Sequence, residues 1–240
     1  MKLGKLPPKL DDRTLRLSTY LIPDQLPPIP LAHDWTRPVR KWSMLGNDEY
    51  GDCTIATAGH MIRAWTANDS KVVVLPDSRI IQTYLSLTGG GDTGLCVLDV
   101  LNYWRKTGIA GHKIEAFVKV DSLDNFRAAC YLFGGVYCGF ALPLAAQNMK
   151  VWYLNPGQSL TGDFAPGSWG GHAVPALAYG PWGDAVVTWG YEQYMTKAFF
   201  LAYCDEAYAV LSKDWLGEDG KAPHGFNYEA LQADLTLLAK

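Results

Sequence analysis

The chain has 240 residues, of which 48% are hydrophobic and 19% charged, and its formal net charge is −3. This length allows one large domain or two small lobes around a sizeable core. Nine Trp, thirteen Tyr and eight Phe exclude the aromatic-poor composition of a disordered chain. The slight acidity, with Lys and Arg spread along the chain, argues against nucleic acid as a partner. No apolar run reaches the about eighteen residues that a membrane span needs.

Five cysteines are present, and none forms a C-x-x-C pair. The odd count and this spacing argue against a disulfide framework and against a zinc ribbon. We therefore expect neither a metal nor a cofactor, and we expect four of the thiols to pack as small apolar side chains. The first residues are basic but lack an apolar signal segment, which predicts a cytoplasmic or virion-associated protein.

Residues 1–32 form the first recognisable segment, which is rich in proline and lacks helical periodicity. We interpret it as an extended arm that lies on the body of the protein, with a flexible tail as the alternative. Apolar side chains favour the docked arm: Leu15, Leu17, Tyr20, Leu21 and Ile22.

Helical periodicity dominates the next part of the chain. Helices are predicted over 53–66, with Asp52 as the N-cap, and over 76–87 and 94–107.

Strand patterns then take over. Strands are predicted over 112–120, 136–142, 173–179, 185–189 and 207–212, with short helices over 121–132 and 195–204, a long loop over 143–171, and an amphipathic terminal helix over 226–239. Helices gathered before strands favour an α+β fold in which the helices and an antiparallel sheet are segregated.

Cys53 stands out among the thiols because it begins a predicted helix directly after a tight turn. Free N–H groups at a helix N-terminus lower the pKa of a thiol and can bind an oxyanion. A nucleophilic thiol also needs a base. His172, at the rim of a predicted strand after two glycines, is the candidate, whereas His60 lies two helical turns from Cys53 and is expected to pack in the core.

Several segments, in order, resemble the papain-like cysteine peptidases. Trp35 precedes Cys53 by eighteen residues, which is also the family spacing. The strongest match reads GHAVPALAYG over 171–180, close to the family's D-H-A-V-x-A-V-G-Y-G. Weaker matches are Ile29-Pro30, Asp34-Trp35-Thr36, Gly90-Gly91, Gly108-Ile109, GGVYCGF over 134–140, and Val187-Thr188-Trp189-Gly190.

The resemblance implies a papain-like fold with two lobes and a substrate cleft between them. The expected division is an arm over 1–32, a domain over 33–213, and a C-terminal extension over 214–240. Within the domain, a helical lobe would span about 50–110 and a β lobe about 111–213. The arm is too short to be the family's propeptide, although it could lie across the cleft.

The resemblance also assigns site residues. Cys53 would be the nucleophile, His172 its base, and Asn47 the oxyanion donor, six residues before Cys53 where the family has Gln. The position of the family's His-orienting Asn falls on Val187, which has no polar side-chain atom. Thr188 is adjacent but should point to the other face of a regular strand, so the third member is missing, displaced or supplied elsewhere. Substrate-binding residues would be Gly90, Gly91, Trp169 and Trp189.

The leading hypothesis is a cysteine hydrolase that cleaves a peptide or amide through a thioester on Cys53. The alternative is a papain-fold protein with weak or no catalysis from a bacterium or bacteriophage, kept as a binding or structural component of a larger assembly such as a virion. In that case the arm or the terminal helix would dock on a protein partner. A third hypothesis keeps the thiol chemistry but transfers the acyl group to an amine, or deamidates.

Overall fold

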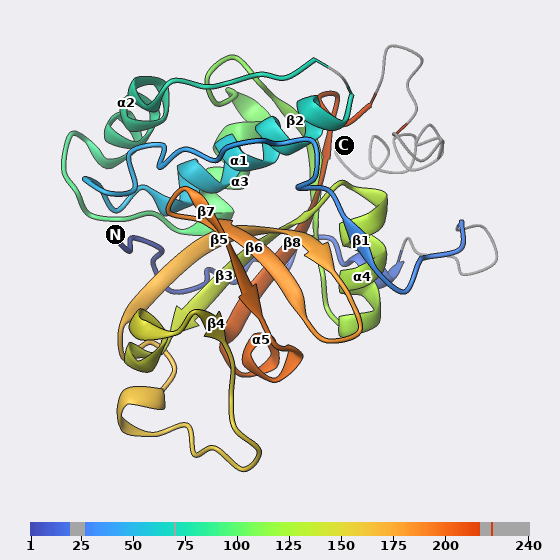
Figure 1. Cartoon of the computed structure of the whole chain (residues 1–240). Helices are drawn as coiled ribbons and strands as arrows, with labels where there is room; N and C mark the ends of the chain where they lie inside the picture. The colour runs from blue at the N-terminus through green and yellow to red at the C-terminus, as the bar shows by residue number, and fades with distance from the viewer. Residues whose placement is uncertain (20–26, 70, 217–221, 223–240) are drawn as a thin grey trace.

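The computed structural model describes residues 1–19, 27–69, 71–216 and 222. The predicted terminal helix over 226–239, and Tyr20, Leu21 and Ile22 of the arm, lie outside these residues. The described chain folds as α+β, with helices on one side of a mostly antiparallel sheet and further helices at its other face (Figure 1). The predicted fold class is therefore confirmed.

Three helices form the helical side: α1 (Cys53–Asn68), α2 (Asp77–Thr88) and α3 (Val97–Lys106). α1 is buried nearly all round because it lies between the other helices and the sheet, which explains why its sequence is apolar on most faces. Asp52 occupies the N-cap position of α1, but its side chain makes no capping hydrogen bond. Asp52 is thus the N-cap residue, as predicted, and its backbone oxygen accepts from the Ile55 and Ala56 N–H groups.

The sheet follows the order β2-β8-β3-β5-β6-β7-β4, and β1 pairs with β5. All of these pairings are antiparallel except that of β4 with β7. The strands are β1 (His33–Asp34), β2 (Ile114–Lys119), β3 (Val136–Leu142), β4 (Val151–Trp152), β5 (Gly170–Tyr179), β6 (Asp184–Thr188), β7 (Tyr191–Met195) and β8 (Cys204–Ser212).

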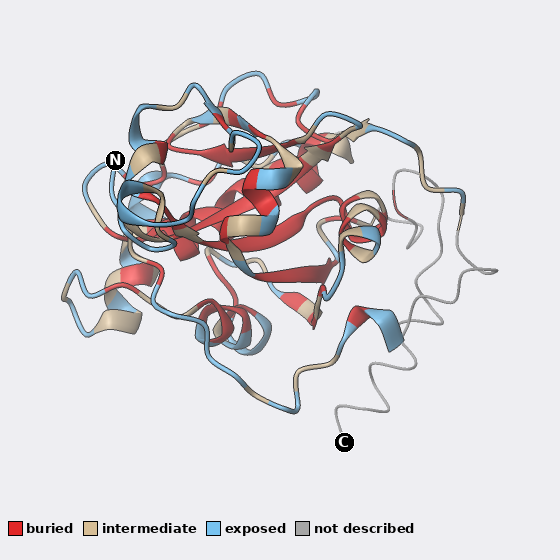
Figure 2. Cartoon of the chain, turned by 90° about the horizontal axis from the view of Figure 1, so that it is seen from below, coloured by how far each residue is buried: buried red, intermediate tan, exposed pale blue. Residues whose placement is uncertain are grey.

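Strand β5 is the centre of the molecule. It is buried from His172 to Leu177, because α1 and α4 (Leu123–Leu132) both pack against it and β3 and β6 pair with it. Figure 2 shows the buried strands at the centre and exposed surface on the outer helices and loops. Strands that are covered on both faces carry continuous apolar runs rather than alternating polar and apolar residues. This burial explains the apolar run of β5.

The structure adds elements that the sequence patterns did not indicate. β7 is largely polar. The long loop contains the two-residue strand β4 and two short 3₁₀ helices, Leu144–Asn148 and Gly162–Phe164. α5 (Lys197–Tyr203) confirms the helix expected near 195–204. β5 begins at Gly170, earlier than predicted, and α3 begins three residues after the predicted start at 94.

The described part of the arm packs on the body, as expected. Leu17 is fully buried, and residues 5 and 16 form isolated bridges with Leu95 and Lys119. At the other end, Trp215 lies beyond the predicted boundary at 213, yet its indole is fully buried and donates to Leu132 O at 2.7 Å. The packed body therefore extends to Trp215.

Candidate active site

Cys53 is the first residue of α1 and is 1% exposed. A turn with left-handed backbone at Leu45 and Gly46 leads into the helix, and Asp92 Oδ1 holds the Gly51 N–H at 2.8 Å. The Cys53 Sγ accepts a hydrogen bond from the Ala173 N–H at 3.4 Å. Because Ala173 follows His172 in β5, the structure brings the thiol and the imidazole predicted from the sequence to one place.

His172 is held by two neighbours from the end of β6. Its Nε2 lies 2.6 Å from Thr188 Oγ1, and the Trp189 ring stacks on the imidazole with centroids 4.4 Å apart and planes at 12°. Its Nδ1 is buried and has no hydrogen-bond partner among the described residues. If Nε2 carries the proton and donates it to Thr188, Nδ1 keeps a free lone pair that can accept a proton.

Thr188 therefore contacts the imidazole, although the sequence placed its side chain on the opposite face. The pairing of Ala176 with Val186 explains the difference. In this register the side chains of Val186 and Thr188 lie on the same face of the sheet as His172, since side chains alternate along each strand. Val187 faces the other way and is fully buried.

Trp189 has a positive φ, which is unusual for a bulky residue, and this backbone conformation places its ring over the imidazole. Trp189 and Gly190 link β6 to β7 with φ of 45° and 78°, the positive values that a tight two-residue hairpin requires. Such a φ is strained for a bulky residue, and it turns the indole back over His172. The Trp169 ring then packs against Trp189 at 5.4 Å.

Asn47 is buried near the start of α1, but no described hydrogen bond joins it to Cys53. Its Nδ2 donates to Tyr50 O at 3.1 Å, and its backbone oxygen accepts from the Lys2 N–H at 3.0 Å. The neighbouring Asp52 is fully buried, and this burial raises its pKa to about 8 despite the nearby Asn47 amide.

The arm lies directly over the thiol. The N–H groups of Gly4 and Lys5 donate to Gly171 O at 3.2 and 3.0 Å. On the other side, the Leu6 N–H donates to Leu95 O at 3.0 Å and the Leu95 N–H to Gly4 O at 2.9 Å. The arm is thus an extended strand bound between the helical side and β5.

Glycine is required at position 4 for this fit. A Cβ there would lie 1.7 Å from Gly51 O, which immediately precedes Asp52 and Cys53. The Trp189 Nε1 also donates to Lys2 O at 3.2 Å. The sequence analysis allowed an arm across the cleft, but no pattern in the sequence indicated these pairings.

No hydrogen bond joins Gly90 or Gly91, the glycines predicted to bind substrate, to the described part of the arm. Gly90 and Gly91 lie in the turn after α2, and a Cβ on Gly90 would meet open space. The main-chain contacts come instead from Gly94 and Leu95, and a Cβ on Gly94 would lie 2.3 Å from Gly4 O. Gly94 lies three residues after Gly91 in the sequence.

Burial sets the protonation of the site in this arrangement. It raises the pKa of Cys53 to about 11, against the opposing effect of the Ala173 and Gly4 N–H groups. It also lowers the pKa of His172 to about 3. Thiol and imidazole are therefore both neutral while the arm covers them.

The other cysteines and His60 lie away from the pair formed by Cys53 and His172. All five cysteines are free, with Cys130 and Cys138 buried. His60 is buried beside Trp42, and its Nε2 lies 2.8 Å from Ser43 O, in line with the expected packing role.

Across the described residues, no group of three His, Cys, Asp or Glu side chains is placed to hold a metal ion. Within the same residues, no helix has the length and apolarity to span a bilayer.

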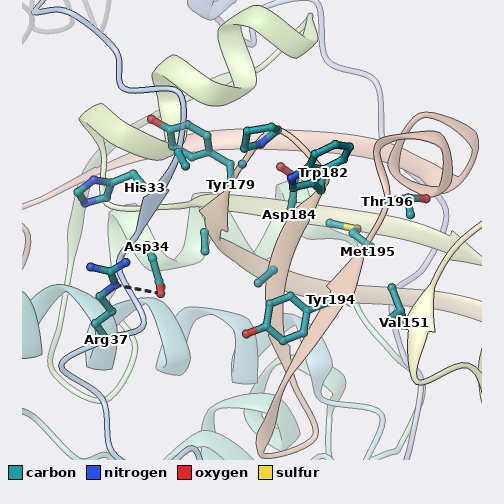
Figure 3. A pocket seen from close by; sticks show the side chains of 16 residues that line it. His33, Asp34, Arg37, Val151, Tyr179, Trp182, Asp184, Tyr194, Met195 and Thr196 are labelled. Atoms are coloured by element: carbon teal, nitrogen blue, oxygen red, sulfur yellow. Dashed lines mark ion pairs between the residues drawn. The ribbon is translucent and has the colours of Figure 1, made fainter.

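A separate hollow of about 400 Å³ lies at the opposite end of β6 (Figure 3). Trp182, Asp184 and Tyr194 line it, together with an ion pair between Arg37 and Asp34 at 3.4 Å. None of the predicted site residues contributes to it.

Comparisons with known proteins establish the fold. No family model and no curated protein matches the sequence. Among solved structures, the chain is similar to xylellain, a cysteine protease from Xylella fastidiosa, with 15% identity, a TM-score of 0.66, and coverage of 88% of this chain and 96% of that one. It is also similar to procathepsin B S9 from Trypanosoma congolense, with 12% identity, a TM-score of 0.65, and coverage of 88% and 86%.

A third similar structure is the Carica candamarcensis cysteine protease CMS1MS2 in complex with E-64. The identity is 15%, the TM-score 0.55, and the coverage 77% of this chain and 99% of that one. The fold is therefore papain-like, and the expected resemblance is confirmed at the level of the fold.

Proposed function

We propose that this protein is a papain-like cysteine hydrolase that acts on peptides or amides. Cys53 Sγ attacks the carbonyl carbon while its proton passes to His172 Nδ1, and the protonated imidazole then donates to the leaving amine. Water deprotonated by His172 hydrolyses the thioester. The Cys53 backbone N–H and the second N–H of the Asn47 amide bind the oxyanion.

One observation carries this proposal: the cleft beside Cys53 holds an extended peptide. Main-chain groups of Gly171 and Leu95 bind the arm from both sides. Hydrogen bonds to main-chain groups hold an extended chain whatever its side chains are, so a substrate peptide can use the same groups. Thr188, whose side chain the sequence analysis expected to point away from His172, supplies the orienting hydroxyl.

The arm itself is held as an inhibitor rather than as a substrate. Leu95 binds the Gly4 carbonyl oxygen, so this carbonyl faces the helical side and not the oxyanion donors. The arm must leave before a substrate enters. Its departure re-exposes the thiol and the imidazole to water, which removes the main cause of their neutral state and favours the thiolate–imidazolium pair.

Selective alkylation tests the proposal. Cys53 is expected to react with iodoacetamide and with E-64, as mapped by mass spectrometry, and the Cys53→Ala variant is expected to lose both this label and hydrolysis of a fluorogenic peptide mixture. Cys204→Ala, which removes a half-buried thiol of β8, is the matched control and should keep both. Labelling of Cys53 no faster than that of Cys204, even with the arm displaced, would contradict the proposal.

The alternative is a binding protein with little catalysis, and the covered, neutral thiol favours it. In that case the arm stays bound, and displacing it yields no hydrolysis. If hydrolysis occurs, adding a primary amine to the same assay separates hydrolysis from acyl transfer, because an amine acceptor gives a substituted amide as product.

A further inference from the structure

The hollow at the far end of β6 has the properties of a ligand site that is separate from the thiol (Figure 3). β6 begins with Asp184 at this hollow and ends with Thr188 at the imidazole. The volume of about 400 Å³ lies within the range of pockets that hold small organic molecules, about 300–1,000 Å³. Neither Cys53 nor His172 lines the hollow, so a ligand there is independent of the proposed hydrolase.

Exposed aromatic side chains line the hollow. Trp182, in the turn between β5 and β6, is 91% exposed, and Tyr194 of β7 is 57% exposed. The turn is closed by a hydrogen bond from the Gly180 N–H to Gly183 O at 2.8 Å. A Cβ on Gly183 would lie 2.1 Å from Met195 O, so the turn packs tightly against the end of β7. Large apolar side chains that are grouped at one exposed place are typical of binding surfaces.

Asp184 adds a buried negative charge to this aromatic surface. The residue is 4% exposed and lines the hollow. Its carboxylate has no hydrogen bond or ion pair with any described residue, and Lys197 and Arg127 act on it only at longer range. Burial raises the pKa of Asp184 to about 6, so the carboxylate still carries its charge at neutral pH. Among the described residues, no cation therefore contacts this buried charge.

The second carboxylate of the hollow differs in this respect. Asp34 Oδ2 lies 3.4 Å from Arg37 Nε. Asp34 Oδ1 accepts from the Thr36 N–H at 2.9 Å and from the Thr36 hydroxyl at 2.6 Å. Asp34 and Arg37 therefore neutralise each other, and of the two carboxylates Asp184 is the one that can take a further cation.

We propose that the hollow binds an organic cation, an ammonium or guanidinium group on an apolar stem. The charge pairs with Asp184, and the stem lies against Trp182 and Tyr194. The faces of Trp and Tyr rings attract a cation within about 6 Å, which adds to the ion pair. A free amine and a lysine or arginine side chain of a peptide share this chemistry.

Desolvation explains why the ligand must be positive. Any molecule seated in the hollow removes water from Asp184, and a buried carboxylate without a partner carries the full cost of that loss. A neutral ligand leaves this cost uncompensated, and an anion adds repulsion. A cation supplies the partner at the point where water is lost. Selection therefore acts against neutral and anionic molecules of the same shape.

Three ligands of one shape test the role of charge: 3-phenylpropylamine, 3-phenylpropan-1-ol and 3-phenylpropionate. Their Kd values are measured by ligand-observed NMR titration at neutral pH with the full-length wild-type chain, in which the arm covers Cys53. We expect saturable binding of the amine. The alcohol should bind at least about tenfold more weakly, as for the loss of a charge-assisted contact, and the carboxylate most weakly of all.

Matched variants assign the preference to the hollow. Asp184→Asn keeps the shape of the side chain but removes its charge, and it is expected to give the amine and the alcohol about equal Kd values. Asp163→Asn, which removes a charge at an exposed position outside the hollow, should leave both values unchanged.

A second variant keeps the test valid if Asp184→Asn fails to fold. Trp182→Ala changes an exposed side chain, and it should weaken binding of the amine at least about threefold through the lost contact with the cation. Leu201→Ala is its control, because Leu201 is also exposed and lies outside the hollow, and it should leave the Kd of the amine unchanged.

A capped peptide with one lysine, N-acetyl-Ala-Lys-Ala-amide, identifies the source of the cation. Binding of the peptide as tight as that of the amine, and lost in Asp184→Asn, assigns the hollow to a basic side chain of a peptide. Binding of the amine without the peptide assigns it to a free amine.

Three results would overturn the proposal: equal Kd values for amine and alcohol, a preference for the amine that survives Asp184→Asn, or no saturable binding of the amine in the millimolar range. Each of these results leaves the labelling of Cys53, and with it the proposed hydrolase, unaffected.

Discussion

The Gly4→Ala substitution tests how the arm controls the thiol. The added Cβ would lie 1.7 Å from Gly51 O and 2.4 Å from Gly51 C. Nonbonded carbon atoms approach to about 3.5 Å, so the arm or Gly51 must move by roughly 1.5 Å. Gly51 is held by Asp92 and leads directly into α1, whereas the arm is a chain terminus. The arm is therefore expected to yield.

The size of the effect follows from the bonds that hold the arm. Its hydrogen bonds to Gly171 and Leu95 are 2.9 to 3.2 Å long, and a shift of this size would break two or three of them. At about 1 kcal/mol for each lost bond, the open state becomes roughly 30- to 150-fold more populated. Because the arm covers Cys53, the rate of its alkylation should rise by the same factor.

The assay is the rate of iodoacetamide modification of Cys53, mapped by mass spectrometry, in wild type and variant. Leu10→Ala changes an exposed arm residue and is the matched control, with an expected rate equal to that of wild type. An alkylation rate in Gly4→Ala within twofold of wild type would refute the conclusion that the arm covers the thiol, provided circular dichroism shows both proteins folded.

Three further predictions follow from the site. Thr188→Val removes the hydroxyl 2.6 Å from His172 Nε2. Loss of one such hydrogen bond, at about 1–3 kcal/mol, should lower kcat/KM roughly 5- to 150-fold. Thr188→Ser keeps the hydroxyl and should restore kcat/KM. The alkylation rate of wild-type Cys53 should keep rising toward pH 11, because burial raises the pKa of the thiol to about 11. In Gly4→Ala, where the arm is displaced, the rate should level off at a lower pH. The same pH profile in wild type and Gly4→Ala would contradict this prediction. In the folded state the pKa of Asp52 is about 8, above its ordinary 3.8. Between these values the folded state binds a proton that the unfolded state lacks, so the free energy of unfolding should fall as pH rises from about 4 to 8. Asp52→Asn should flatten that slope in urea unfolding and gain a few kcal/mol above pH 8. Asp163→Asn, at an exposed position, should leave the slope unchanged.

Local patterns predicted the elements that form the site. The periodicity of residues 53–66 indicated α1, and the apolar run after His172 indicated β5, since both are long and bounded by turn residues. The position of Cys53 at a helix start and of His172 at a strand rim followed from these elements. The need of a nucleophilic thiol for a base made His172 the candidate partner of Cys53. The resemblance then implied that the two residues share one site, which no local pattern shows for residues so far apart in the sequence.

The remaining features depend on tertiary contacts. Whether Thr188 or Val187 faces His172 is decided by the register between β5 and β6, and a shift of one residue reverses the faces. Lys5 looked like an ordinary basic residue of a Pro-rich arm. Its burial against Glu206 arises only when a segment near residue 5 meets a strand near residue 206, which the composition of neither segment indicates.

Trapping the acyl-enzyme tests the central claim most directly. The Gly4→Ala protein is mixed with a peptide ester, quenched in acid within the first turnover, and mapped by mass spectrometry. The account predicts a mass increase equal to the acyl group on the peptide that contains Cys53, and its absence in a protein that also carries Cys53→Ala. Ester cleavage that persists without Cys53, or an acyl group on any other residue, would contradict the account.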